Sequence, residues 1–219
     1  MISFNDVKNN SSVKTYIEYA DKSLSALGYT EHSYAHVGLV SKRAEYILSS
    51  LGYDDKDIEL VKIAALLHDI GNVINRKDHS QSGAVMAFRI LDNMGMDPED
   101  IAKIVSAIGN HDEGDGVAVN HLAAALIIAD KSDVRRTRVR NNDFTTFDIH
   151  DRVNYSVISS DLKINDEKTQ INLILEIDTA ISSVVNYFEI FLQRMIMCRK
   201  AASSLKLDFK LTVNGQELM

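Results

Sequence analysis

A histidine and an aspartate stand side by side at the end of an apolar stretch of the sequence. His68 and Asp69 follow residues 58–67, in which apolar residues recur every three to four positions. This spacing is typical of a helix with one buried face, and His68 falls on that face. Burying a carboxylate is costly unless it is paired or bound to a metal ion. The sequence therefore predicts a cation at this helix end, and a divalent metal ion would suit both side chains.

Other histidines and aspartates lie near the ends or on the apolar faces of further predicted helices. They are His36, His79, His111 and Asp130. In a helical bundle, positions of this kind can converge on one interior site. Imidazole and carboxylate suit iron, manganese, cobalt, nickel or zinc, and the set requires no cysteine. Together with His68 and Asp69 the set exceeds one tetrahedral site. It would suit two metal ions about 3.5–4 Å apart with a shared carboxylate.

Each of these residues also has an ordinary structural explanation. A single histidine on a helix is more often a core or surface residue than a metal ligand. His79 and His111 could be helix-end residues that interact with the helix dipole. Asp130 could be an acid at a helix C-terminus, although that end disfavours negative charge, which slightly favours the metal interpretation. The residue types and their spacing leave both explanations open.

The elements that must position these residues are mostly helices over the first 135 residues. Few prolines and long stretches with a period of 3.6 predict helices near residues 12–27, 33–51, 55–70, 79–94, 98–110 and 118–134. Asp97 and Pro98 form a good helix start, with Asp as N-cap and Pro at the first helical position. Four glycines fall where helices should stop, namely Gly28, Gly52, Gly71 and Gly95.

The pattern changes after about residue 141. Residues 153–158 are rich in β-branched residues and partly alternate, and residues 171–177 alternate. Both segments therefore predict strands, with a turn at 165–168 between them. A helix near 180–204 and a strand over 207–213 follow. We therefore expect a mainly α protein: a helical domain over residues 1–140 and a small β-β-α-β appendage over residues 141–219. The appendage should pack on the helical domain or on a partner subunit, because its apolar strand face needs cover.

Composition and charge narrow the class of protein. The 219 residues are 45% hydrophobic, which supports a real core, and their net charge of −7 argues against general nucleic-acid or anionic-membrane binding. The single cysteine, Cys198, permits no internal disulfide, and a reducing compartment suits such a chain. No apolar stretch approaches the roughly 18 residues that span a bilayer, and the N-terminus lacks the pattern of a signal peptide. We expect a cytoplasmic protein.

The order of the candidate ligands resembles the signature of the HD-domain superfamily of metal-dependent phosphohydrolases. That signature runs His, His-Asp, Asp, as in His36, His68-Asp69 and Asp130. Two further motifs, His-x-x-x-Gly-Ala at 79–84 and Ala-Asp-Lys-Ser-Asp at 129–133, are similar to those of its dinuclear subclass. The resemblance covers residues 31–135 and implies an HD-type helical bundle. It further implies that Asp69 bridges two metal ions. His36, His68 and Asp130 would also bind the first ion, and His79 and His111 would also bind the second.

This resemblance implies an activity. A hydroxide that bridges two divalent metal ions would hydrolyse a phosphoester or phosphoanhydride in a nucleotide or other small phosphorylated metabolite. Iron or manganese is the leading expectation, with cobalt, nickel or zinc as alternatives. Asn72 replaces the usual lysine of the cyclic-dinucleotide phosphodiesterases, and no Gly-Tyr-Pro follows His111. The Glu-Asp pair of the alarmone hydrolases and the His-rich continuation of the dNTP triphosphohydrolases are also missing. What remains resembles the small dinuclear HD hydrolases.

Several further residues are candidates for contact with the substrate. Arg76, Lys77 and Lys131 could hold a substrate phosphate, because guanidinium and ammonium groups bind phosphate oxygens well. The alternative is a solvated loop or a salt-bridged face. His32 lies four residues before His36 on the same face. His32 is a candidate acid that would protonate the leaving oxygen, and the alternative for it is a plain polar contact. Asp69 is the other candidate catalytic residue.

Two other functions stay open at this point. The chain could be a non-catalytic nucleotide sensor that signals through its C-terminal appendage, or a di-iron oxygenase on the same fold. All six expected ligands are present, which favours catalysis. A homodimer formed through the C-terminal region is a further expectation.

Overall fold

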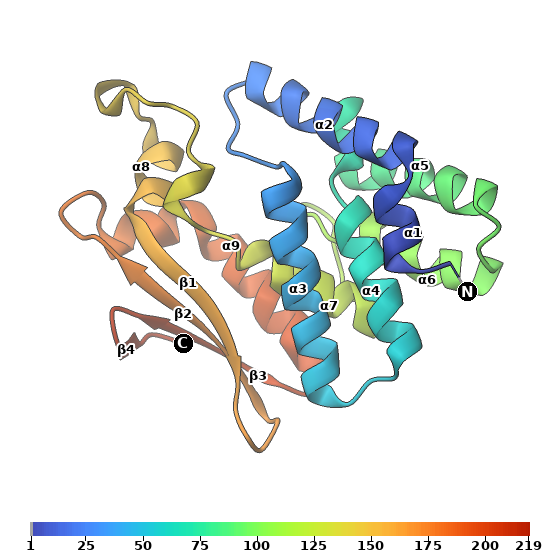
Figure 1. Cartoon of the computed structure of the whole chain (residues 1–219). Helices are drawn as coiled ribbons and strands as arrows, with labels where there is room; N and C mark the ends of the chain where they lie inside the picture. The colour runs from blue at the N-terminus through green and yellow to red at the C-terminus, as the bar shows by residue number, and fades with distance from the viewer. Residues whose placement is uncertain (1) are drawn as a thin grey trace.

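Helices dominate the chain up to Lys131, and a small sheet with its own helix lies along one side of them (Figure 1). The structure is a computed structural model that describes residues 2–219. The helices of the first part are α1 (Phe4–Asn9), α2 (Ser11–Ala26), α3 (Tyr34–Leu51), α4 (Asp55–Leu67), α5 (His79–Asn93), α6 (Pro98–Gly109) and α7 (His121–Lys131). Short 3-10 helices are η1 (Ile70–Val73), η2 (Arg136–Arg138) and η3 (Phe144–Thr146). The mainly α fold class is confirmed.

The helix boundaries follow local capping more than apolar periodicity. Helix α1 was not predicted, although Ser3 and Asp6 form a reciprocal capping box at its start. Helix α6 begins as expected, with Asp97 as N-cap and Pro at the first position. Helix α7 begins at His121 rather than near 118, because the Asn120 side chain caps it.

Helix α7 is the central helix of the bundle. All its residues from Leu122 to Ala129 are buried, as expected of a helix that is apolar on every side. It contacts α3, α4, α6 and α9. Four alanines in this segment permit such close neighbours. The helix therefore carries Asp130, its penultimate residue, into the interior of the molecule.

The C-terminal part has the expected β-β-α-β order with additions at both ends. Its elements are α8 (Ile149–Ser156), β1 (Val157–Ile164), β2 (Gln170–Ile177), α9 (Val184–Ser204), β3 (Asp208–Val213) and β4 (Gln216–Glu217). The sheet order is β1-β2-β3-β4, with β2 and β3 parallel and the other neighbours antiparallel. Helix α9 makes the crossover between the parallel strands.

The strand predicted over 153–158 is wrong for most of its length. Residues up to Ser156 belong to α8, and β1 starts only at Val157. The Asp148 side chain accepts a hydrogen bond from the backbone N–H of Asp151 at 2.8 Å, which caps a new helix. The cap outweighs the modest strand preference of the β-branched residues that follow.

The C-terminal elements share one continuous buried core with the helices. Helix α9 contacts both α7 and β3, and it buries Tyr187, Phe191 and Met195. Polar contacts also join the two parts: Arg43 of α3 donates to the backbone oxygen of Ser160 in β1 and to the Ser132 hydroxyl. The domain division at residue 141 stays a prediction. Within residues 2–219, no helix is both long and apolar enough to cross a membrane.

Candidate metal centre

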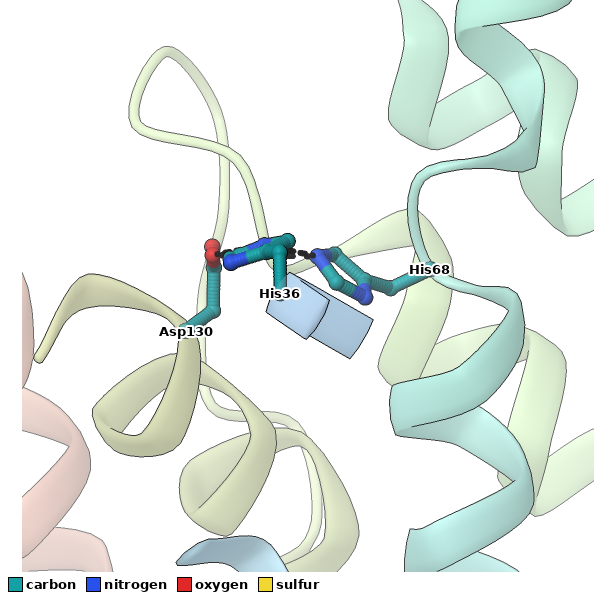
Figure 2. Close-up of side chains that lie close together, drawn as sticks. All are labelled: His36, His68 and Asp130. Atoms are coloured by element: carbon teal, nitrogen blue, oxygen red, sulfur yellow. Dashed lines mark hydrogen bonds and ion pairs between the residues drawn. The ribbon is translucent and has the colours of Figure 1, made fainter. Parts of the chain in front are cut away.

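The structure brings all six predicted metal ligands into one buried cluster. The four histidines of this set are at most 1% exposed, and Asp69 is 5% exposed. The ligands come from separate elements: His36 from α3, His68 and Asp69 from the end of α4, His79 from the start of α5, His111 from just after α6, and Asp130 from α7. Figure 2 shows the His36 ring between the Asp130 carboxylate and the His68 ring.

Two glycines bring α5 close to the His-Asp turn. Gly71 was predicted to end a helix, but it lies inside η1 and its φ is not positive. A Cβ on Gly71 would lie 2.0 Å from the backbone oxygen of His79 and 2.5 Å from the nitrogen of Gly83. Only a residue without a side chain fits such an approach. This contact places His79 opposite the His68-Asp69 pair.

Each histidine ring of the cluster is oriented by a hydrogen bond at Nδ1. The Nδ1 atoms of His68, His79 and His111 lie 2.8, 3.0 and 2.6 Å from the backbone oxygens of Ala65, Arg76 and Ile108, respectively. The Nδ1 of His36 lies 2.7 Å from the Asp133 carboxylate. An acceptor at Nδ1 keeps the proton on that nitrogen, so Nε2 of the neutral ring presents a lone pair.

The four Nε2 atoms meet in pairs. The Nε2 atoms of His36 and His68 are 3.3 Å apart, and those of His79 and His111 are 3.2 Å apart. Two lone pairs at this distance repel each other unless a proton or a metal ion lies between them. A tetrahedral metal ion with nitrogen ligands at about 2.0–2.1 Å places two of them roughly 3.3 Å apart. The donor set therefore fits metal ions.

Asp69 faces both pairs of histidines. Its Oδ2 lies 3.5 Å from His36 Nε2 and 3.2 Å from His68 Nε2, whereas its Oδ1 lies 3.4 Å from His79 Nε2. Asp130 Oδ1 lies 3.3 Å from His36 Nε2, which completes the first group of donors. Donor atoms of His36, His68 and Asp130 lie within 4.8 Å of one another, as do those of His68, Asp69 and His111. This arrangement can hold two cations on either side of one carboxylate.

Proton binding in the cluster depends on burial and on the two carboxylates. Burial lowers the pKa of His68, but the charge of Asp69 and bonds to both aspartates outweigh it and raise this pKa to about 10. Burial and the neighbouring His68 lower the pKa of His111 to about 3. Burial raises the pKa of Asp69, but the charge of His68 and bonds from the histidines hold it well below its usual value. Metal binding at this site must therefore displace a proton from His68.

A small polar cavity of about 30 Å³ adjoins the ligand cluster. Its basic lining residues are Arg76, Lys131, Arg138 and Arg194. Lys131 is 5% exposed, and its Nζ lies 2.8 Å from Asp130 Oδ2. Arg76 Nη1 lies 3.3 Å from His79 Nε2 and 4.0 Å from Asp69 Oδ1. Cationic side chains therefore surround the open side of the cluster, where an anion would be attracted.

The predicted substrate residues divide into two groups. Arg76, Lys131 and His32 line the polar cavity, whereas Lys77 is exposed and lines no part of it. His32 Nδ1 lies 2.6 Å from the Thr30 backbone oxygen. Burial and the charge of Arg138 lower the pKa of His32 well below its ordinary value. A neutral ring offers an acceptor at Nε2, which differs from the protonated acid that the sequence suggested.

Sequence reasoning missed three residues around this cavity. Asp133 orients His36, and its place in the 129–133 motif was a usable signal. Arg138 belongs to a basic stretch over residues 131–140, and it donates to the backbone oxygens of Asp133 and Glu31 at 2.7 and 2.8 Å. Arg194 lies on α9, far along the chain, and no local signal points to it.

Comparison with known proteins gives a family match and similar proteins. Residues 33–137 match the family model described as HD domain, which supports the HD-domain superfamily for this segment. The uncharacterized protein MJ1020 of Methanocaldococcus jannaschii is 26% identical over 211 residues, covering 85% of this chain and 79% of that protein. A predicted HD superfamily hydrolase from an uncultured Thermotogales bacterium has a crystal structure with a TM-score of 0.45 to this one. It is 27% identical, with coverage of 57% of this chain and 67% of that one. The dinuclear subclass stays a prediction.

Proposed function

We propose that this protein is a metal-dependent phosphohydrolase with two divalent transition metal ions. The observation that carries the proposal is Asp69, whose two oxygens face two separate pairs of histidine Nε2 atoms inside a buried cluster. The HD-domain match across residues 33–137 supports the same activity. Iron and manganese suit this mixed imidazole and carboxylate set best among the candidates, with cobalt, nickel or zinc as alternatives.

When bound, two such ions supply an activated water and neutralise charge on a phosphoryl group. The chain's own residues do the rest. His36, His68, Asp69 and Asp130 would hold one ion, and His79, His111 and Asp69 the other. The guanidinium groups of Arg76 and Arg194 would bind phosphoryl oxygens that point away from the ligands. Phosphoryl transfer depends mainly on such positioning and charge stabilisation.

Two lining residues have narrower roles in this proposal. Lys131 neutralises Asp130 through its 2.8 Å contact and adds positive charge to the cavity. Neutral His32 accepts a hydrogen bond at Nε2, because its Nδ1 is held by the Thr30 carbonyl. It would thus orient a water or a substrate hydroxyl rather than donate a proton.

The substrate we propose is a small phosphorylated metabolite, such as a nucleotide. The cluster is buried and the adjoining cavity is small, so a single phosphoryl group fits better than a polymer. We also propose a cytoplasmic location, supported by the single buried cysteine, Cys198, which has no partner in the chain. A homodimer through the C-terminal region stays a prediction.

The decisive experiment is metal analysis joined to an activity panel. The protein is purified anaerobically, stripped with a chelator, and reconstituted with iron(II) or manganese(II). We expect more than one metal ion per chain and phosphate release from at least one small phosphate ester. At most one metal ion after reconstitution would remove the dinuclear claim. Metal binding without phosphate release from any ester would favour a sensor, and metal-dependent oxygen consumption would favour an oxygenase.

A further inference from the structure

A larger cavity adjoins the polar one on the side away from the metal ligands. It has a volume of about 240 Å³ and lies among the loop after α2, helix α8 and helix α9. His32, Arg76 and Arg194 line both cavities, so the two share one wall. A substrate whose phosphate lies at the metal centre would therefore extend its other end into this outer cavity.

Aromatic rings hold the two arginines at the junction of the cavities. The Arg194 guanidinium lies 4.4 Å from the ring centroid of Phe191, and the Arg76 guanidinium lies 5.8 Å from that of Tyr29. Both residues line the outer cavity, where the Tyr29 side chain is exposed and Phe191 is buried beneath Arg194. The Nε of Arg194 also lies 2.6 Å from Glu113 Oε1, and within residues 2–219 its other guanidinium nitrogens make no hydrogen bond. The arginines are thus fixed in place with donors left for an anion.

The α8 side of the outer cavity offers the opposite chemistry. Asp148, Asp151 and Asn154 line it, and each has an oxygen that makes no hydrogen bond within the described chain. Asp148 Oδ1 accepts a hydrogen bond from the Asp151 backbone N–H, and Asp151 Oδ2 accepts one from the Asn141 side-chain amide at 3.4 Å. The side-chain amide nitrogen of Asn154 donates to the His150 backbone oxygen at 2.8 Å, so the side-chain oxygen of Asn154 can still accept a hydrogen bond. This wall can accept hydrogen bonds and repels anions.

We infer that the outer cavity binds the leaving group of the substrate, and that this group is a hydroxyl-rich organic moiety such as a sugar or a nucleoside. The inference rests on the proposed phosphohydrolase activity. The hydroxyls donate to the α8 oxygens, and the exposed ring of Tyr29 packs against the flat or carbon face of the moiety. A leaving group that is itself a phosphate chain meets two carboxylates and is disfavoured.

This assignment gives the C-terminal segment a function. Helices α8 and α9 lie beyond residues 33–137, the part that matches the HD-domain model. The matched segment supplies the metal ligands, whereas the segment after it supplies the acceptors and Arg194. In this assignment, the residues that select the substrate follow, along the sequence, the residues that would bind the metal ions.

The test compares leaving groups and variants in the full-length, manganese-loaded protein. The substrates are adenosine 5'-monophosphate, ribose 5-phosphate, phenyl phosphate as the hydroxyl-free leaving group, and adenosine diphosphate as the anionic one. The variants are Asp151→Ala and Asn154→Ala. Asp166→Ala, in the exposed β1–β2 turn, is the matched control. The readout is the ratio of kcat/KM on each hydroxylated substrate to kcat/KM on phenyl phosphate.

We expect the wild type to prefer a hydroxylated monoester over phenyl phosphate and over adenosine diphosphate. Each cavity variant should lower that ratio about tenfold, mainly through KM, because it loses one hydrogen bond to the bound moiety. The control should keep the wild-type ratio. Preference for adenosine monophosphate over ribose phosphate identifies a nucleoside pocket, and the reverse identifies a sugar pocket; both support the inference.

Failure of the inference and failure of the proposed function give different results. If phenyl phosphate is cleaved as well as the hydroxylated esters, or if the cavity variants keep the wild-type ratio, the inference is overturned and the hydrolase stands. If no ester is cleaved, the proposed function fails, and calorimetry with free adenosine and free ribose still tests the cavity. Binding that weakens in Asp151→Ala then supports the pocket, and no binding of either ligand by the wild type overturns it.

Discussion

Within residues 2–219, Asp69 is the carboxylate whose two oxygens approach histidines of both pairs in the ligand cluster. Its oxygens lie 3.2 Å from His68 Nε2 and 3.4 Å from His79 Nε2, on opposite sides. Asn72 donates to Asp69 Oδ1 at 2.9 Å and so fixes the rotation of the carboxylate. Arg76 approaches the same oxygen only at 4.0 Å, from the cavity side. Substitution of Asp69 and substitution of Arg76 should therefore have different effects.

Asp69→Ala should lose metal and abolish phosphate release, whereas Arg76→Ala should keep both metal ions. The arginine variant loses a charged hydrogen bond to substrate, worth about 1.5–3 kcal/mol, so its catalytic efficiency should fall roughly 10- to 150-fold. Metal content by elemental analysis and kcat/KM on the same preparations check both statements. An Asp69→Ala protein with full metal content and full rate would refute the metal centre itself. An Arg76→Ala protein with unchanged kinetics would remove only the arginine from the proposal.

Asp133 would act on the proposed metal centre through His36. The Asp133 carboxylate accepts from His36 Nδ1 at 2.7 Å and is 1% exposed. Asp133→Asn keeps the shape but weakens this hydrogen bond, so manganese affinity should fall about 10- to 100-fold. Competition with a chelator measures the affinity, and Asp166→Asn, an exposed turn residue, is the control. Equal affinities in the two variants would show that His36 needs no such support.

The metal-free protein should be most stable near pH 6.5, because two histidines are shifted in opposite directions from that value. His68 has its pKa raised to about 10, so its contribution is complete below 6.5 and is lost as the pH rises toward 10. His111 has its pKa lowered to about 3, so its contribution is present above 6.5 and is lost as the pH falls toward 3.

Thermal unfolding of chelator-treated protein across this range checks the pH prediction. The midpoint temperature should be highest near pH 6.5 and should decrease at both lower and higher pH. With saturating manganese, the decline between about pH 6.5 and 8.5 should disappear, because a metal-bound imidazole carries no exchangeable proton at Nε2. A metal-free midpoint that rises steadily across the alkaline part of the range would contradict the protonated state of His68.

At the scale of elements, the approach of α5 to η1 determines where the second pair of histidines lies. Gly71 and Gly83 meet at this crossing, and a Cβ on Gly71 has no room beside the His79 backbone. Gly71→Ala should therefore cost about 3 kcal/mol or more of unfolding free energy and lower metal content to about one ion per chain. Denaturant unfolding and elemental analysis measure the two effects.

Gly38→Ala is the matched control for this substitution. Gly38 lies inside α3, two residues after His36, and a Cβ there meets nothing within 4 Å. Alanine in such a helical position should stabilise the protein by roughly 0.5–1 kcal/mol and leave metal binding intact. If both glycine variants behave alike, the crossing of α5 and η1 is not what positions His79.

Many of the helices, and the ligand cluster that they position, could be predicted from the sequence. The long helices α2 to α7 and α9 follow from apolar periodicity, and the ligand cluster follows from residue order together with a family resemblance. The misread start of β1 and the missed α1 share a cause, since in both places a side-chain cap at Asp148 or Ser3 decides the local structure. Arg194 could not be foreseen, because its position depends on how α9 packs against α7 and not on any neighbouring residue.

At the scale of the whole molecule, the C-terminal segment covers the central helix. Helix α7 is apolar on every side, so without α9 one of its faces would meet water. Polar contacts reinforce this packing. The Ser160 hydroxyl of β1 donates to the Ser132 backbone oxygen at 2.6 Å, and Arg136 Nε donates to the Tyr155 backbone oxygen at 2.7 Å. Arg194 on α9 also lines the proposed phosphate site. Stability and activity should thus both depend on residues after 141.

Limited proteolysis of the full-length protein tests this dependence. Residues 142–146 are exposed and join the two parts, so they offer a cleavage site. After a cut there, we expect the two fragments to elute together in native size-exclusion chromatography and to separate only in denaturant, because the buried core is continuous across the cut. Phosphate release should persist in the nicked complex and disappear when the C-terminal fragment is removed, since Arg194 and the cover of α7 leave with it. A folded fragment of about residues 1–140 that elutes alone with full activity would show that the C-terminal segment is an independent appendage.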